Sequence, residues 1–301
     1  MAEGYQDGMW RRWWPFALVC LLASSVWLVT DSYPQVQSTL ASEAIAGALA
    51  AIVSVGSAVV LKRRGGGVSG LVRPAVAGAM VLGGPAAAGL LGAGGVDSTG
   101  VAIALSLTPV VVAVAESVLG EDALDAGELW PGLVAVTALL LVLAPPLLTD
   151  VRSDVALVLG PLLTGVGCVM FRRSGAGVAA AWKVSAGLVG AAVVYGAVVM
   201  GEGVVRRQLP EVSLAAVGID AVLFGLGILA LSRVTASQYA ARYALVPLLI
   251  LLQGVLLLHS EVTVRIAACG VLLAIASVVL LRSGVKVADD EFGGVENPPP
   301  G

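Results

Sequence analysis

Residues 244–258 read ALVPLLILLQGVLLL, a nearly unbroken apolar run with a proline as its fourth residue. A strand of a membrane β-barrel alternates apolar and polar residues, whereas Leu248–Leu252 shows no alternation. Backbone N–H and C=O groups in lipid must bond within their own segment, so this run is expected to be a membrane helix.

Similar apolar segments occupy most of the chain. They cover 13–30, 43–61, 73–93, 99–119, 129–147, 154–171, 180–200, 212–232, 237–258 and 263–281. A helix needs about 20 apolar residues to cross the hydrocarbon region. The 301 residues are 58% hydrophobic and 12% charged, whereas soluble domains carry about 25% charged residues. The sequence therefore predicts an all-α membrane protein with about ten transmembrane helices.

Positive charge is distributed unevenly between the two sides that ten helices define. With the N-terminus inside, the inner side receives Arg11, Arg12, Lys62, Arg63, Arg64, Arg73, Arg172, Arg173, Lys183, Arg233, Arg282 and Lys286. The outer side receives only Arg152, Arg206, Arg207 and Arg265. Cytoplasmic loops carry such an excess, so we expect a multi-pass protein of the cell (inner) membrane with both termini in the cytoplasm.

Several function classes lack support in the sequence. The net charge of −3 and the absence of a basic patch argue against nucleic-acid binding. No metalloprotease, Walker A or nucleophile-elbow motif occurs, and the sole histidine, His259, lies at an outer boundary. Cys20, Cys168 and Cys269 have no metal-ligand spacing and are expected to be small buried hydrophobes. We therefore expect no enzyme activity, no cofactor and no metal.

A proline-centred pattern occurs twice, 138 residues apart, at Leu107–Val111 and at Leu245–Leu249. Pro109 and Pro247 each lie near the middle of a span and are expected to bend it. We therefore expect a unit of five helices to occur twice. Because five is odd, the second copy enters the membrane from the opposite side, which is the inverted repeat of secondary transporters.

The residues around both prolines resemble the EamA-type pattern of the drug/metabolite transporter superfamily. The first copy reads Thr108-Pro109, Gly120-Glu121 and Gly132, and the second reads Val246-Pro247, Ser260-Glu261 and Gly270. The second copy departs from the pattern, because Ser260 stands where a glycine is usual. The resemblance implies ten helices, cytoplasmic termini, a central cavity and transport of small metabolites.

The expected organisation follows from this repeat. It consists of a cytoplasmic N-terminus (1–12), a first five-helix repeat (13–147), an outer linker (148–153), a second five-helix repeat (154–282), and a disordered, acidic and proline-rich cytoplasmic tail (283–301).

Charged residues inside spans are the leading site candidates, since each costs about 2.5–3.5 kcal/mol at a helix centre. Asp220 is a candidate carboxylate for a proton or cation, with a structural hydrogen bond as the alternative. Arg242 has Tyr239 and Tyr243 beside it and suits an anionic solute, because a guanidinium binds oxyanions bidentately. The alternative for Arg242 is snorkelling to the inner headgroups.

Hydroxyl groups supply further candidates for substrate contact. Ser106 and Thr108 flank the bend before Pro109, where they either bond carbonyl groups freed by the proline or contact the solute. Tyr195 in the seventh span is a weaker candidate.

The sequence thus predicts a secondary transporter that moves a small polar or amphipathic metabolite by alternating access, with H⁺ or Na⁺ as a candidate coupling ion. Two alternatives remain. One is a lipid carrier or flippase-like protein, and the other is a scaffold or assembly subunit without transport. The expected partners are the solute and membrane lipid, and the sequence leaves a homodimer open.

Overall fold

The structure is a computed structural model that describes residues 2–32, 39–61, 68–91, 98–120, 126–142, 151–174, 178–206, 212–259 and 261–293. Within these ranges every regular element is helical. The helices are α1 (Ala2–Ser32), α2 (Leu40–Val60), α3 (Val68–Leu91), α4 (Ser98–Leu105), α5 (Thr108–Gly120), α6 (Ala126–Val142), α7 (Val151–Arg173), α8 (Ala180–Arg206), α9 (Leu214–Arg233), α10 (Ala236–Ala240), α11 (Arg242–Leu257) and α12 (Val264–Gly293).

Seven helical stretches in the described part are long and apolar enough to cross a membrane. They lie in α1, α2, α4–α5, α8, α9, α10–α11 and α12, and α6 contributes a shorter apolar helix. Helices satisfy all their backbone groups internally, which is the requirement for a segment surrounded by lipid. The chain is therefore an all-α, multi-pass membrane protein, as its composition predicted.

Two of these stretches, Val101–Leu119 and Ala236–Leu257, are interrupted about one and a half turns after their first residue. Between α4 and α5, the Ser106 and Leu107 amides donate to carbonyls of the preceding turn, and Pro109 is the second residue of α5. Proline is tolerated in a first helical turn, where its missing N–H has no intrahelical acceptor. Between α10 and α11 the interruption is at Ala241, whereas Pro247 lies inside α11.

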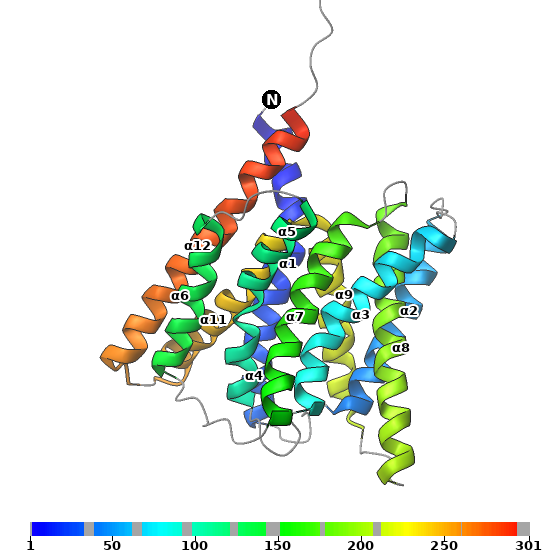
Figure 1. The fold of residues 1–301 in the computed structure, drawn as a ribbon, viewed down its shortest axis with the longest axis horizontal. Helices are drawn as coiled ribbons and strands as arrows, with labels where there is room; N and C mark the ends of the chain where they lie inside the picture. The colour runs from blue at the N-terminus through cyan, green and yellow to red at the C-terminus, as the bar shows by residue number, and fades with distance from the viewer. Residues whose placement is uncertain are drawn as a thin grey trace, which may run out of the picture.

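The spans pack as a closed cycle (Figure 1). Contacts run from α1 to α9, α2, α8, α3, α7, α5, α6, α12 and α11, and from α11 back to α1. The pair α6–α12 lies at one end of the long axis in Figure 1, and the pair α2–α8 lies at the other. The start of α1 and the end of α12 lie at the same end of the bundle, which we call the N-terminal end.

Glycine allows α3 to approach α7 and α8 closely. A Cβ added at Gly78 would collide with the backbone of Gly187, and one added at Gly84 would collide with Thr164. Small residues give membrane helices such close contact in the absence of a hydrophobic driving force between them.

Helix boundaries differ from the predicted ones on both sides of residues 154–282, the predicted second repeat. Helix α7 begins at Val151, so 151–153 of the predicted outer linker are helical, while 143–150 lie outside the described residues. Helix α12 continues to Gly293, through 283–293 of the predicted cytoplasmic tail, while 294–301 lie outside the described residues. Extending an existing helix adds one hydrogen bond per residue without a new nucleation cost, which allows α12 to continue beyond its apolar part.

Candidate functional site

Arg242 is clamped between two tyrosine rings at the start of α11. Its Cζ atom lies 4.5 Å from the centroid of the Tyr239 ring and 4.6 Å from that of Tyr243. Nη1 donates a hydrogen bond to the Tyr239 hydroxyl and Nη2 donates one to the Tyr243 hydroxyl, each over 2.5 Å. Each ring therefore binds the cation through both its π face and its oxygen.

The clamp formed by Arg242, Tyr239 and Tyr243 lies beside three other helices, α1, α7 and α9. A Cβ on Gly227 of α9 would lie 3.3 Å from the Tyr239 hydroxyl and 3.6 Å from Arg242 Nη1, so this wall of the site has little room for a side chain. Thr164 of α7 interacts with the Tyr243 hydroxyl. Cys20 of α1 and Cys168 of α7 lie within electrostatic reach of the guanidinium.

The positive charge of Arg242 has no carboxylate partner among the described residues. Its contacts are the two tyrosines and polarisable neighbours, which offset part of the cost of an intramembrane charge. Tyr239 is fully buried, whereas Arg242 and Tyr243 are half-buried and so retain surface that a small molecule can contact. A guanidinium has five N–H donors, and the tyrosines accept from two of them, so the clamp can still donate to an oxyanion.

Asp220 lies on α9, seven residues before Gly227 and half-buried. Because seven residues make almost two helical turns, Asp220 and Gly227 lie on nearly the same face of α9, about 10 Å apart along its axis. Its electrostatic neighbours include Tyr195. The structure therefore places Asp220 on the face of α9 that meets the clamp, but separated from Arg242 by about two turns.

Tyr195 and Ser106 are occupied by structural contacts. The buried Tyr195 hydroxyl donates to the Leu82 carbonyl of α3 over 2.9 Å, and its ring lies 5.4 Å from that of Phe224. The Ser106 hydroxyl donates to the Ile103 carbonyl in the last turn of α4. The hydroxyl of Thr108 is buried and has no hydrogen-bond partner within the described residues.

Two glutamines that the sequence analysis did not select connect helices on either side of the clamp. Gln238 of α10 accepts from Arg12 over 3.1 Å and donates to the Leu281 carbonyl of α12 over 3.3 Å. Gln253 of α11 donates to the hydroxyls of Ser24 and Ser25 on α1, each over 3.1 Å. An uncharged amide inside an apolar run indicates a hydrogen bond to another helix, because a buried amide needs partners. This feature of the sequence could have identified both glutamines.

All three cysteines are free and buried, as predicted. Within the described ranges no group of three or more potential ligands could hold a metal ion. The Arg242 clamp is therefore the described site with the clearest capacity to bind a charged ligand.

Comparisons with known proteins agree with this fold. A solved structure described as "Crystal structure of protein" matches the chain with a TM-score of 0.63 and 17% sequence identity, and covers 89% of this chain and 96% of that one. At this identity the likeness shows a shared fold alone. No family model and no curated protein matches the sequence.

Proposed function

We propose that the protein is a secondary transporter that moves a small polar or amphipathic metabolite by alternating access, with the solute bound at the Arg242 clamp. The observation that carries the proposal is a half-buried cation inside a membrane helix bundle without a carboxylate partner in the described chain. Charges at such depth are retained where they serve function. A carboxylate or phosphate on the solute would supply the missing negative charge.

The packing of the helices supports two related halves, as alternating access requires. In this comparison each helix of α1–α6 corresponds to the helix six places later, so that α1 corresponds to α7 and α6 to α12. The α3–α8 contact then corresponds to the α9–α2 contact, the α7–α5 contact to α1–α11, and the α5–α6 contact to α11–α12. The pairs α2–α8 and α6–α12 correspond to themselves. This pattern is what an inverted repeat would give, and it agrees with the sequence resemblance to drug/metabolite transporters.

Contacts between the halves favour closure at the N-terminal end. Helix α10 lies inside the cycle there, since it contacts α5, α7 and α12. Arg12 of the first half binds Gln238 of the second, and Arg233 lies 5.6 Å above the Trp14 ring. Arg173 of α7 donates to the Leu119 and Glu116 carbonyls of α5. Release of these contacts would open this end, so they are suitable elements of a gate.

Solute binding and flux test the proposal directly. Purified protein is screened for solute-induced shifts in melting temperature with carboxylates, phosphate esters, zwitterions and cations, and the best solute is then followed into proteoliposomes. We expect an anionic solute to stabilise the protein and Arg242→Gln to lower its affinity and flux by roughly 10- to 100-fold, because a hydrogen bond to a charged group contributes about 1.5–3 kcal/mol. Asp220→Asn should alter the dependence of flux on the proton or sodium gradient.

Arg73→Gln is the matched control, because Arg73 is exposed near the start of α3. Its flux should equal that of the wild-type protein. Wild-type flux in both Arg242→Gln and Asp220→Asn would contradict the site, and an absence of response to all four solute classes would contradict transport.

A further inference from the structure

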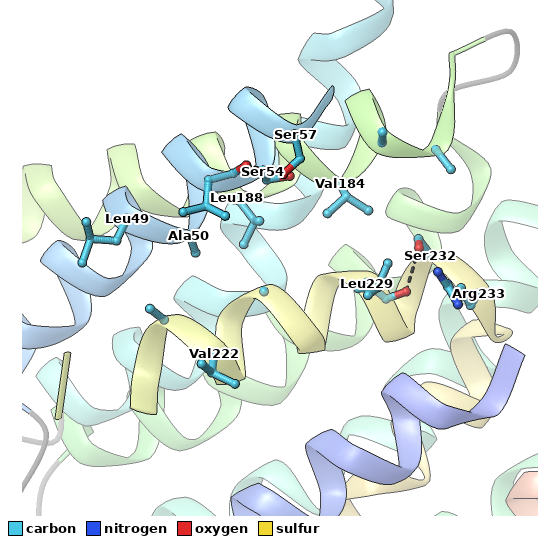
Figure 2. A pocket seen from close by; sticks show the side chains of 15 residues that line it. Leu49, Ala50, Ser54, Ser57, Val184, Leu188, Val222, Leu229, Ser232 and Arg233 are labelled. Atoms are coloured by element: carbon cyan, nitrogen blue, oxygen red, sulfur yellow. Dashed lines mark hydrogen bonds between the residues drawn. The ribbon is translucent and has the colours of Figure 1, made fainter. Parts of the chain in front are cut away.

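A groove of about 530 Å³ separates α2, α8 and α9 (Figure 2). Its floor includes Ala50, Val184 and Leu188, of which Leu188 is 1% exposed. Its rim includes Val53 and Val222, which are 67% and 50% exposed. A buried floor with exposed rim residues means that the groove opens sideways, and within a membrane-spanning bundle a lateral opening faces hydrocarbon.

The glycines at the two corresponding helix contacts have different surroundings. A Cβ built on Gly225, which lines the groove, would meet nothing within 4 Å. The contact between α3 and α8, which corresponds to that between α9 and α2, is instead closed by glycines at which an added Cβ would strike backbone, as at Gly78 and Gly190. Within the described residues, the contact between α2 and α9 therefore leaves space at Gly225, whereas the contact between α3 and α8 is filled at Gly78 and Gly190.

The lining is apolar apart from Ser54, which bonds to Ser185, and from Ser57, Ser232 and Arg233. Figure 2 shows Ser232 and Arg233 together at one end, and Ser57 also lines the groove. The Ser57 and Ser232 hydroxyls donate to carbonyls of their own helices over 2.7 Å. Arg233 is the charged group of the lining, and its guanidinium also lies 5.6 Å above the Trp14 ring.

The length of the groove matches one leaflet of a bilayer. Val222 and Arg233 are eleven residues apart on α9, which is about 17 Å at 1.5 Å per residue. Half of the hydrocarbon core is about 15 Å thick. Arg233 ends α9 at the N-terminal end of the bundle, where a lipid headgroup of the adjacent leaflet would lie.

We propose that this groove binds one acyl chain of a phospholipid from the leaflet at the N-terminal end, with the lipid phosphate at Arg233. The apolar walls accommodate the chain, and the arginine selects an anionic headgroup over a zwitterionic one, because a net negative charge keeps its full attraction to the guanidinium. This site is separate from the Arg242 clamp and does not depend on transport.

Native mass spectrometry measures the bound lipid directly. The wild-type protein is exposed to phosphatidylglycerol or phosphatidylcholine in detergent, and the fraction carrying one lipid is compared with that of Gly225→Leu and of Gly218→Leu. Gly218 is the matched control, because it lies on the same helix outside the groove and a Cβ there also meets nothing within 4 Å. We expect at least a tenfold loss of retained lipid in Gly225→Leu and wild-type retention in Gly218→Leu.

Arg233→Gln tests the headgroup, with Arg73→Gln as its control. Arg233→Gln should retain the chain and lose the preference for phosphatidylglycerol, whereas Arg73→Gln should keep it. An unchanged preference in Arg233→Gln would overturn the placement of the phosphate. Equal retention in Gly225→Leu and Gly218→Leu, whether high or low, would overturn the groove.

A second measurement on the wild-type protein does not require any variant to fold. A phospholipid with a photoreactive acyl chain is crosslinked in liposomes, and the modified residues are mapped. We expect crosslinks to concentrate on Val53 and Val222 relative to Val118 and Leu256, which are 72% and 70% exposed outside the groove. An even distribution over all four would reject a specific lipid site.

Discussion

Replacing Arg242 with methionine should separate ligand binding from stability. Removing an intramembrane charge should stabilise the folded protein in the membrane by about 2.5–3.5 kcal/mol. The loss of two cation–π contacts costs about 0.5–2 kcal/mol each, and the two hydrogen bonds to tyrosine add a net cost of about 1 kcal/mol each. These terms oppose one another, so we expect the free energy of unfolding to fall by no more than about 3.5 kcal/mol, while affinity for an anionic solute falls at least tenfold.

The assay compares unfolding in detergent, followed by near-ultraviolet circular dichroism, with and without the best anionic solute. Arg242→Lys keeps the charge but loses the planar fork, so its affinity should lie between those of the wild type and Arg242→Met. Arg73→Met controls for loss of an exposed arginine. Breaking a structural buried network typically costs 3–5 kcal/mol. A loss of more than about 4 kcal/mol in Arg242→Met, with solute affinity unchanged in the folded fraction, would show that the clamp is structural and would refute the reasoning.

Three further predictions concern contacts between helices. Gly190→Leu should destabilise the protein by at least about 1–3 kcal/mol in thermal unfolding, because its Cβ collides with an α3 carbonyl, whereas Gly196→Leu on the same helix, where a Cβ meets nothing, should change little. Tyr195→Phe should cost about 1 kcal/mol of stability, the usual net value of one hydrogen bond, and leave solute affinity unchanged; a selective loss of affinity would place its hydroxyl in the binding site. Gln238→Leu should speed alkylation of buried Cys168 by maleimide several-fold, because the α1–α10–α12 connection is lost, and an unchanged rate would show that these hydrogen bonds do not hold the N-terminal end closed.

Local spacing was sufficient to predict the tyrosine clamp in outline. Tyr239 and Tyr243 lie three residues before and one residue after Arg242, so any helix-like backbone brings the three side chains near one another. The prediction used only positions on one segment. It could not show that Gly227 of α9 would form the opposite wall, because that contact depends on which helix faces which.

The other site candidates illustrate the same limit. Tyr195 looked available for a solute, and only the approach of α3 revealed that its hydroxyl is bound to the Leu82 carbonyl. Gln238 and Gln253 were overlooked because their partners come from distant parts of the chain. A polar residue in a span indicates that a partner exists, but the sequence does not identify the partner.

Composition and segment length by themselves determined that this chain is a multi-pass helical membrane protein, because lipid leaves the backbone no other way to satisfy its hydrogen bonds over such long apolar runs. The cycle of helix contacts, the surroundings of Arg242 and the groove between α2, α8 and α9 were decided only by the tertiary structure. In a soluble helix the apolar stripe identifies the buried face, whereas a membrane helix is apolar toward both lipid and protein. Small residues and backbone approach therefore choose the neighbours, and those choices become visible only when the helices are packed together.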